Sequence, residues 1–353
     1  MTEEKQLMKG IEAIGEAALR AGCKHYYGFP IAPQTELQEY MAKHLPERGG
    51  VFLQAENPAA AISMAYGASA GGALVLTSSS GPGISLMMEA CSYLTAAELP
   101  CVLVNISRGG PGFGNIYPAQ SDYWQATKGG GHGDYHLIVL APGSVQEMAD
   151  LTLLAFELAY RFRNPVMILA DAALAQMMDK VYFKHAPLKP SPKKGWAVKG
   201  NSGGDQKVIT SIYLNSEELE QHNRNLQKKY ELISQSHTLY DLYRVEKANH
   251  LIVAFGIASQ ICRKAIDQFH GEGHRVGLIR PITLFPFPTQ VIEDHVKKIK
   301  GLFVVEMNLG QMFQDVLLAV QGKTAVQFFG RTGGATPTVD EVVKAVKEFI
   351  RKK

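Results

Sequence analysis

The chain has 353 residues, 46% of them hydrophobic, with 36 basic and 33 acidic side chains and a net charge of +3. This composition excludes a disordered chain, because it can bury a sizeable core. The near-balance of charge gives no sign of a nucleic-acid or acidic-membrane partner. The first residues are charged, and no apolar run approaches the ~20 residues of a membrane helix. We therefore expect a cytoplasmic protein.

The cysteines are widely spaced, and none forms the C-x-x-C pairs typical of zinc and iron–sulfur sites. We expect no metal site held by this chain alone. In a reducing cytoplasm, such cysteines act as small buried hydrophobic residues. They are Cys23, Cys91, Cys101 and Cys262.

In the first half of the chain, short apolar runs alternate with segments of helical periodicity. This alternation predicts a parallel sheet covered by helices on both faces. Ser144 and Glu147 are expected to form a capping box that begins a strong helix. Strands are predicted at 24–28, 51–54, 73–77, 101–106, 137–140 and 166–169, and helices at 6–21, 34–45, 59–71, 82–94 and 144–163.

The second half begins with a proline- and lysine-rich connector at 184–207 and a polar, helical stretch at 215–247. A second α/β unit then starts, with strands at 251–255, 275–279 and 302–306. Residues 281–288 hold three prolines and predict a stiff loop. Thr338 and Glu341 form a capping box for a last helix. We expect domains at 1–184 and 249–353, joined by a linker and helix at 185–248.

Glu56 lies where an apolar run stops and a helix starts. Asn57 is a good helix N-cap, and Pro58 fits the first helical position. Open α/β sheets bind ligands at the carboxyl ends of their strands, so Glu56 is a candidate site residue. The alternative is a carboxylate that only complements the helix dipole.

Two glycine-rich stretches and one arginine follow other strands. Residues 80–83 open a helix and either hold a phosphate or polar group or form a tight turn. Residues 109–114 have nearly dinucleotide-binding spacing but open no helix, so we expect a loop beside a site. Arg108 either grips a carboxylate through two N–H bonds or forms an internal ion pair. His132 is expected to be structural, and Ser78–Ser80 lack the context of a nucleophile.

Taken together in chain order, eight motifs resemble the alpha subunits of 2-oxoacid:ferredoxin oxidoreductases. The resemblance runs from about Lys9 to the C-terminus and weakens between 184 and 247. Residues 128–135 and 144–148 look most like the subunit of 2-oxoisovalerate (3-methyl-2-oxobutanoate) oxidoreductases. The motifs are GFPIAP at 28–33, QAE at 54–56, SSGPG at 79–83, RGGP at 108–111, QSD at 120–122, GHGD at 131–134, RPITL at 280–284 and EMN at 306–308.

The resemblance implies an α/β fold with a thiamine-diphosphate pyrimidine-type domain and a transketolase C-terminal-like domain. It implies that Glu56 is catalytic and hydrogen-bonds the pyrimidine ring of thiamine diphosphate. Arg108 would hold the substrate carboxylate. The remaining implied site residues are Pro30, Ser80 and Gly81 at the cofactor, and Ile31 and Ala32 at the substrate.

The chain departs from the family at Ala32, where a threonine is common, so a polar substrate contact is missing or replaced. It also lacks the Gly-Asp-Gly motif that normally holds the diphosphate and Mg²⁺. The resemblance therefore implies a cofactor site shared with a thiamine-diphosphate/Mg-binding beta subunit. A gamma subunit and a ferredoxin-like iron–sulfur subunit would complete the complex, with ferredoxin, a 2-oxoacid and coenzyme A as reactants. The alternatives are a 2-oxoglutarate enzyme and a non-catalytic assembly subunit.

Overall fold

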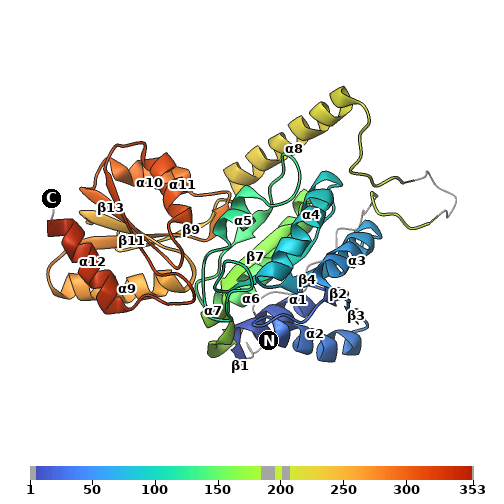
Figure 1. Ribbon diagram of the computed structural model, residues 1–353, viewed down its shortest axis with the longest axis horizontal. Coiled ribbons are helices and arrows are strands. Elements are labelled where there is room, and N and C mark those ends of the chain that lie inside the picture. Colours follow the sequence, from blue (N-terminus) through green and yellow to red (C-terminus); the bar gives the residue numbers. More distant parts are fainter. Residues whose placement is uncertain (1–4, 184–194, 201–206, 352–353) are drawn as a thin grey trace.

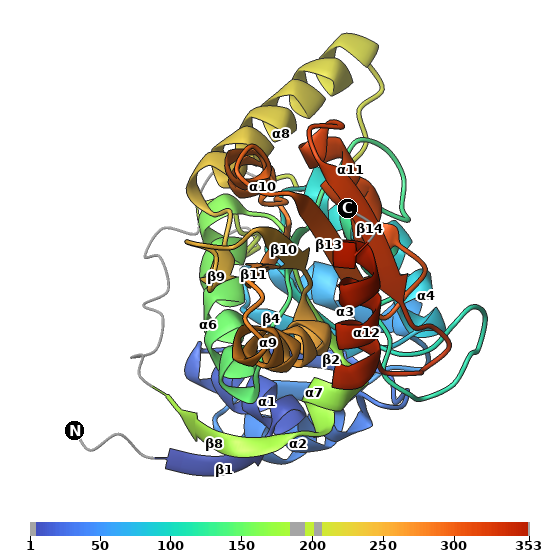
Figure 2. The same ribbon diagram turned by 90° about the vertical axis from the view of Figure 1, so that its left-hand side faces the viewer.

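The computed structural model describes residues 5–183, 195–200 and 207–351. They form two sheet-centred units that lie side by side, with the C-terminal unit at the opposite end from the N-terminal strand (Figures 1 and 2). The predicted connector at 184–207 falls mostly outside these residues. No helix in the described ranges is both long and apolar enough to cross a bilayer.

The first unit is built on a seven-stranded sheet whose central strands are all parallel. Successive side chains of a strand point to opposite faces, so each strand contributes to two cores. Leu76, Val104 and Ile168 face one side of the sheet, and their chain neighbours face the other. In sheet order the strands are β12 (Thr283–Phe285), β6 (Ile138–Leu140), β7 (Val166–Asp171), β5 (Val102–Ser107), β4 (Val75–Ser79), β2 (His25–Gly28) and β3 (Val51–Gln54).

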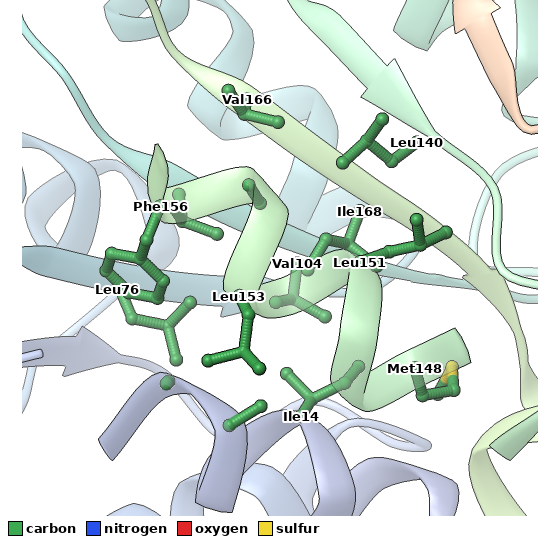
Figure 3. Close-up of a cluster of buried hydrophobic side chains, with 14 of the residues drawn as sticks. Ile14, Leu76, Val104, Leu140, Met148, Leu151, Leu153, Phe156, Val166 and Ile168 are labelled. Carbon is green, nitrogen blue, oxygen red and sulfur yellow. The ribbon is translucent and has the colours of Figure 1, made fainter. Parts of the chain in front are cut away.

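Helices cover both faces of this sheet, as the sequence predicts. Figure 3 shows the core on one face, where Ile14 of one helix and Phe156 of another meet side chains of β4, β5 and β7. The helices in this core are α1 (Gly10–Arg20), α2 (Thr35–Glu47), α6 (Val145–Phe162) and α8 (Ser216–Ser236), and those on the other face are α3 (Pro58–Ala70) and α4 (Pro82–Ala96). Two short helices, α5 (Tyr123–Lys128) and α7 (Ala172–Gln176), follow β5 and β7.

The second unit has a five-stranded sheet, in which β9 alone runs antiparallel to its neighbour. Ile252 faces a core made with α9 and α12, and Leu251 faces the opposite side. In sheet order the strands are β14 (Ala325–Gly330), β13 (Gly301–Glu306), β10 (His250–Val253), β11 (Val276–Pro281) and β9 (Tyr240–Tyr243). The helices are α9 (Gly256–Gly271), α10 (Thr289–Val296), α11 (Gln311–Val320) and α12 (Val339–Arg351).

The predicted stiff loop at 281–288 is partly wrong. Thr283–Phe285 form β12, which pairs antiparallel with β6 at the edge of the first sheet. The second half of the chain therefore completes the sheet of the first half. Proline-rich sequence favours an edge strand over a central one, because proline cannot donate to the ladder.

Three further predictions need correction at their boundaries. The expected helix at 6–21 begins only at Gly10, because β1 (Lys5–Lys9) pairs with β8 (Met178–Tyr182). The expected helical stretch at 215–247 ends at Ser236, and β9 follows it. β14 was not predicted, since it lies at a sheet edge with exposed positions and a weak apolar pattern.

Only half of the capping box at Ser144 and Glu147 forms. The Ser144 side chain accepts the Glu147 N–H, but the Glu147 carboxylate accepts the Gly143 N–H at 2.7 Å and pairs with Arg280. The Thr338–Glu341 capping box is confirmed, with both bonds present. The four cysteines are free and buried, as expected.

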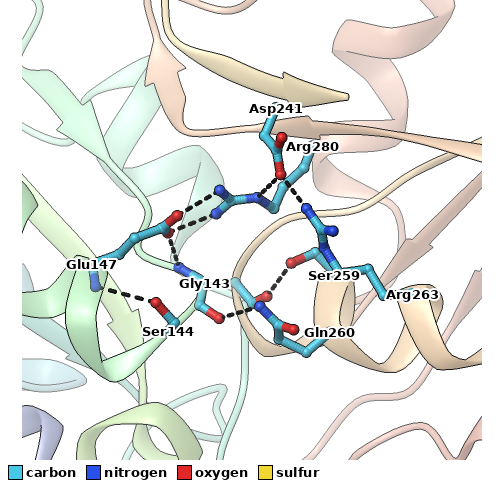
Figure 4. Close-up of polar contacts among 9 residues, drawn as sticks. Gly143, Ser144, Glu147, Asp241, Ser259, Gln260, Arg263 and Arg280 are labelled. Atoms are coloured by element: carbon cyan, nitrogen blue, oxygen red, sulfur yellow. Dashed lines mark hydrogen bonds and ion pairs between the residues drawn. The ribbon is translucent and has the colours of Figure 1, made fainter. Parts of the chain in front are cut away.

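The Arg280–Glu147 pair joins the two units (Figure 4). Both terminal nitrogens of Arg280 in β11 donate to the Glu147 carboxylate in α6, at 2.7 and 2.6 Å. The Arg280 side chain is 4% exposed, and Asp241 of β9 lies on its other side, at 3.5 Å from Nε. Gln260 of α9 adds a hydrogen bond to the Gly143 carbonyl.

We expect Arg280→Ala to lower the free energy of unfolding by about 3 kcal/mol, because it leaves two carboxylates unpaired in a largely buried place. The control is Arg331→Ala, which breaks an exposed pair with Glu341 and should cost less than about 1 kcal/mol. Urea unfolding of both variants measures the difference. Equal losses would mean that the Arg280 pair contributes no more than a surface pair.

Glu306 ends β13 and is fully buried. Its carboxylate accepts the N–H groups of Met312 and Phe313 at the start of α11, at 2.8 and 2.9 Å, and the Asn308 side-chain amide at 2.8 Å. Burial raises the pKa of Glu306 to about 7, and the nearby Asp315 acts in the same direction. The three donors oppose this shift.

The raised pKa predicts a pH-dependent stability. Glu306 binds its proton more tightly in the folded than in the unfolded chain, so its contribution is full below about pH 4.5 and is lost as the pH rises to about 7. Glu306→Gln cannot titrate. From pH 5 to pH 8, the free energy of unfolding of Glu306→Gln should therefore rise relative to that of the unmodified chain, by about 2–3 kcal/mol. Parallel curves in urea unfolding would refute this.

Candidate functional site

The predicted site residues lie along one edge of the first sheet. β3, β2, β4 and β5 are parallel neighbours, and their registers place Gly28 opposite Gln54 and Ser78, and Ser79 opposite Asn105. The loops that leave these strands therefore emerge side by side. They carry Glu56 after β3, residues 30–32 after β2, residues 80–81 after β4 and Arg108 after β5.

The loop at 29–33 is held by a buried polar chain. Gln34 donates from its amide to the Phe29 carbonyl at 2.8 Å and accepts the Ser78 hydroxyl at 2.7 Å. The Tyr26 hydroxyl lies 2.6 Å from that of Ser78. Pro30 and Ile31 are half-buried, whereas Ala32 is exposed. The loop thus presents an exposed small side chain from an anchored backbone.

The Ile31 side chain packs over the start of α4. A Cβ added at Gly83 would lie 2.5 Å from the Ile31 Cδ1 and 3.2 Å from the Pro58 ring. Ile31, Gly83 and Pro58 therefore meet where the loop after β2 reaches the first turns of α3 and α4. This contact gives the site edge an apolar floor beside Glu56.

The turn around Glu56 forms as predicted. Asn57 accepts the Ala60 N–H at 2.8 Å, and Pro58 begins α3. The Ala55 N–H donates to the Gly28 carbonyl, which ties the turn to β2. The Glu56 side chain is exposed. Within the described residues its carboxylate has no hydrogen bond or ion pair, so it can meet a ligand from outside the chain.

Ser80 and Gly81 differ in what they can offer to a ligand. The Ser80 hydroxyl is buried and donates to the Ile106 carbonyl at 2.7 Å, so it is already used inside the chain. Gly81 has φ +52° and ψ −125° and precedes Pro82, the first residue of α4. A Cβ at Gly81 would lie 2.8 Å from Arg108 Nε. Glycine is therefore needed here for both backbone and space.

Arg108 bridges two loops through backbone carbonyls. Its Nη1 donates to the Ala32 carbonyl at 2.6 Å and its Nη2 to the Phe113 carbonyl at 3.1 Å. Its Nε is buried beside Gly81 and has no hydrogen-bond partner among the described residues. The guanidinium is thus neither free nor in the internal ion pair weighed from the sequence. A ligand carboxylate would take the place of one carbonyl.

A cleft of about 550 Å³ opens beside Arg108, between the two units. The glycine-rich loop lines it, as expected of a loop beside a site. The first unit contributes Gly81, Arg108 and Asp122, and the second contributes Asn308 and Gln311. Asp122 accepts the Asn105 amide at 3.1 Å, and burial raises its pKa.

The histidine of the 131–134 motif lies elsewhere. His132 is exposed on the loop before β6, away from the cleft residues. The described residues contain no group of three or more His, Cys, Asp or Glu side chains arranged to hold a metal ion. Sequence reasoning gave no role to Asp122 or Asn308, although both belong to motifs that carry the family resemblance.

Residues 16–241 match the family described as pyruvate flavodoxin/ferredoxin oxidoreductase, thiamine diP-bdg. The chain belongs to this family. Residues 248–342 match a second description, pyruvate:ferredoxin oxidoreductase core domain II. The α/β fold, the thiamine-diphosphate-binding family and the oxidoreductase-subunit class expected from the sequence are therefore confirmed.

Two relatives align over nearly the whole chain. Ketoisovalerate oxidoreductase subunit VorB of Methanothermobacter marburgensis is 45% identical over 344 residues, 98% of this chain and 97% of the relative. The 2-oxoglutarate synthase subunit KorA of the same organism is 33% identical over 373 residues, 98% of this chain and 99% of the relative.

Two solved structures share the fold. A 2-oxoglutarate:ferredoxin oxidoreductase from Magnetococcus marinus, with 2-oxoglutarate, coenzyme A and succinyl-CoA bound, has a TM-score of 0.89 and 27% identity. The match covers 99% of this chain and 66% of that one. A split gene transketolase, an inactive beta4 tetramer, has a TM-score of 0.60 and 14% identity, with 97% of each chain covered. This second likeness concerns the fold alone.

The contact between Gly81 and Arg108 can be tested on the chain by itself. We expect Gly81→Ala to lower the free energy of unfolding by about 1–3 kcal/mol, because an L side chain is strained at this backbone conformation. The matched control is Gly67→Ala in α3, where nothing lies within 4 Å of the new Cβ. That change should stabilise the chain by about 0.5–1 kcal/mol. Two stabilising or two neutral changes in urea unfolding would contradict the assigned backbone.

Proposed function

We propose that this chain supplies one side of a thiamine diphosphate site in a cytoplasmic complex that oxidises a branched-chain 2-oxoacid to an acyl-CoA. The substrate proposed is 3-methyl-2-oxobutanoate, with coenzyme A as acyl acceptor and ferredoxin as electron acceptor. The observation that carries the proposal is the gathering of Glu56, Gly81 and Arg108 at one edge of a parallel sheet. The identity to VorB, higher than that to KorA, favours the branched-chain substrate.

The residues at this edge fit the pyrimidine side of the cofactor. Glu56 offers an exposed carboxylate, and Ile31 offers an apolar surface close to it. Thiamine diphosphate, when bound, would supply the nucleophilic carbon that releases the substrate's carboxyl group. Glu56 would hold a proton at a pyrimidine nitrogen, and Pro30 and Gly81 would bound the ring from the neighbouring loops. The exposure of Glu56 in this chain leaves room for a partner to exclude water.

The oxoacid would sit next to Arg108 and Ala32. Arginine binds a carboxylate with two parallel N–H bonds, and Nη1 and Nη2 are the nitrogens now facing loop carbonyls. Exchange of a neutral carbonyl for a carboxylate strengthens the hydrogen bond, since both partners are then charged. Ala32 and Ile31 border this place with apolar groups, which suits an uncharged branched side chain.

The rest of the enzyme is proposed to lie on partner subunits. The chain has no Gly-Asp-Gly motif and no paired cysteines. A beta subunit would hold the diphosphate and Mg²⁺, and gamma and ferredoxin-like subunits would complete the complex and carry the iron–sulfur clusters. The division of this chain into domains at 1–184 and 249–353 with a linker at 185–248 stays a prediction, although β9 of that linker pairs with the second sheet.

The test of substrate class is the complex purified with its native partners. We expect the highest kcat/KM with 3-methyl-2-oxobutanoate in a panel of 2-oxoacids, with coenzyme A and ferredoxin present. A preference for 2-oxoglutarate would support the runner-up function, which the Magnetococcus structure represents. Loss of every activity in an intact complex would support a non-catalytic assembly subunit.

Glu56→Ala tests the catalytic assignment. Loss of a positioned acid–base group costs about 10²–10⁴-fold in rate, so turnover of the assembled complex should fall on that scale while assembly is kept. Glu56→Gln should also be impaired, because an amide cannot exchange the proton. The control is Glu39→Ala, another exposed glutamate, on α2.

The decisive readout is exchange of the C2 proton of thiamine diphosphate bound to the complex. We expect slower exchange in Glu56→Ala than in the unmodified complex and in the Glu39→Ala control. Equal exchange in all three would make Glu56 a residue that only complements the dipole of α3.

A further inference from the structure

Two motifs that carry the family resemblance have no role in the proposed chemistry. They are QSD at 120–122 and EMN at 306–308. The structure brings them into direct contact, although Gln120 and Met307 are 187 positions apart. The contact lies between the two units, at the wall of the cleft beside Arg108.

Gln120 is held entirely by the second unit. Its backbone N–H donates to the Met307 carbonyl and its side-chain oxygen accepts the Met307 N–H, both at 3.0 Å. Its side-chain nitrogen donates to the Phe255 carbonyl at 2.9 Å, and its own carbonyl accepts the Asn308 amide at 2.8 Å. Gln120 is 2% exposed, so loss of these bonds would leave buried polar groups unpaired.

Asn308 connects Gln120 to a rigid support. Its amide nitrogen also donates to Glu306 at 2.8 Å, and its side-chain oxygen accepts the N–H groups of Gly310 and Gln311 at 2.8 and 3.0 Å. Glu306 in turn accepts two N–H groups of α11. The buried chain of bonds thus runs from the start of α11 through Asn308 to the Gln120 backbone.

The segment that this chain of bonds holds forms the cleft wall. Ser121 and Asp122 follow Gln120 and line the cleft with Arg108. Gln311 of α11 donates to the Ser121 carbonyl at 2.8 Å. Residues 119–122 belong to no helix or strand, so bonds to the second unit replace the support of regular secondary structure.

We propose that Gln120 and Asn308 are positioning residues for the substrate site, through which the second unit fixes the Asp122 wall of the cleft beside Arg108. This inference rests on the proposed function for the identity of the cleft as the substrate site. It assigns to the second unit, which carries none of the predicted site residues, a direct share in substrate binding. A wall that shifts by about 1 Å can cost on the order of 10²-fold in rate.

The main variant is Asn308→Ser. Serine ranks with asparagine as an acceptor for helix-start N–H groups, so the start of α11 keeps a cap while the amide donor to Gln120 is lost. The second variant is Gln120→Ala, which removes the side-chain bonds and leaves the backbone. The control is Asn215→Ala, which removes a cap at the start of α8, outside the cleft lining.

The first measurement needs only the chain. Hydrogen exchange should be faster at residues 119–122 in Asn308→Ser and Gln120→Ala and unchanged there in Asn215→Ala, because the Gln120 N–H donates to the Met307 carbonyl. The amides of β10 should keep their protection in all three, which shows that the second sheet is folded. Unchanged exchange at 119–122 in both variants would overturn the inference.

The second measurement uses the assembled complex. We expect KM for the 2-oxoacid to rise about tenfold in each variant with a smaller change in kcat, because lost ground-state binding appears in KM. The double variant should cost less than the sum of the two, since both break one chain of bonds. Unchanged KM despite faster exchange would also overturn the inference. A complex that oxidises no 2-oxoacid even when unmodified would instead refute the proposed function and leave the exchange result standing.

Discussion

Parallel pairing of β5, β4, β2 and β3 is the constraint on which the candidate site depends. Parallel strands end at the same edge, so loops that are far apart in the chain emerge side by side. Each loop then needs its own anchor. Asn57 caps the helix after Glu56, and Gln34 holds the loop that carries Ile31 and Ala32. The sheet gives the residues a common edge, and these local bonds give each one its place.

The second unit is bound to this edge by buried polar contacts as well as by apolar packing. β12 extends the first sheet, Arg280 pairs with Glu147, and Asn308 holds the Gln120 carbonyl. Each contact satisfies groups that would be costly to bury alone. Together they make the relative placement of the units specific, which matters because the cleft beside Arg108 has walls from both.

Arg108 shows how the chain can prepare a charged site without closing it. Two loop carbonyls accept its terminal N–H groups, so the guanidinium is held in position before any ligand arrives. Glu56, by contrast, is exposed. A chain that supplies only one side of a cofactor site leaves its catalytic carboxylate open and its arginine satisfied. Binding would then exchange neutral acceptors for charged ones.

The sequence by itself determined the elements whose hydrogen bonds are local: the helices, most strands, and the turn from β3 into α3 at Glu56. Its family motifs also indicated the fold and the oxidoreductase class. Only the tertiary structure decided the edge position of β12, the carbonyl partners of Arg108 and the bonds between Gln120 and Asn308. Hydrophobic periodicity and caps report bonds within a few residues. A contact across 187 positions leaves no such local pattern, because it depends on how two units pack.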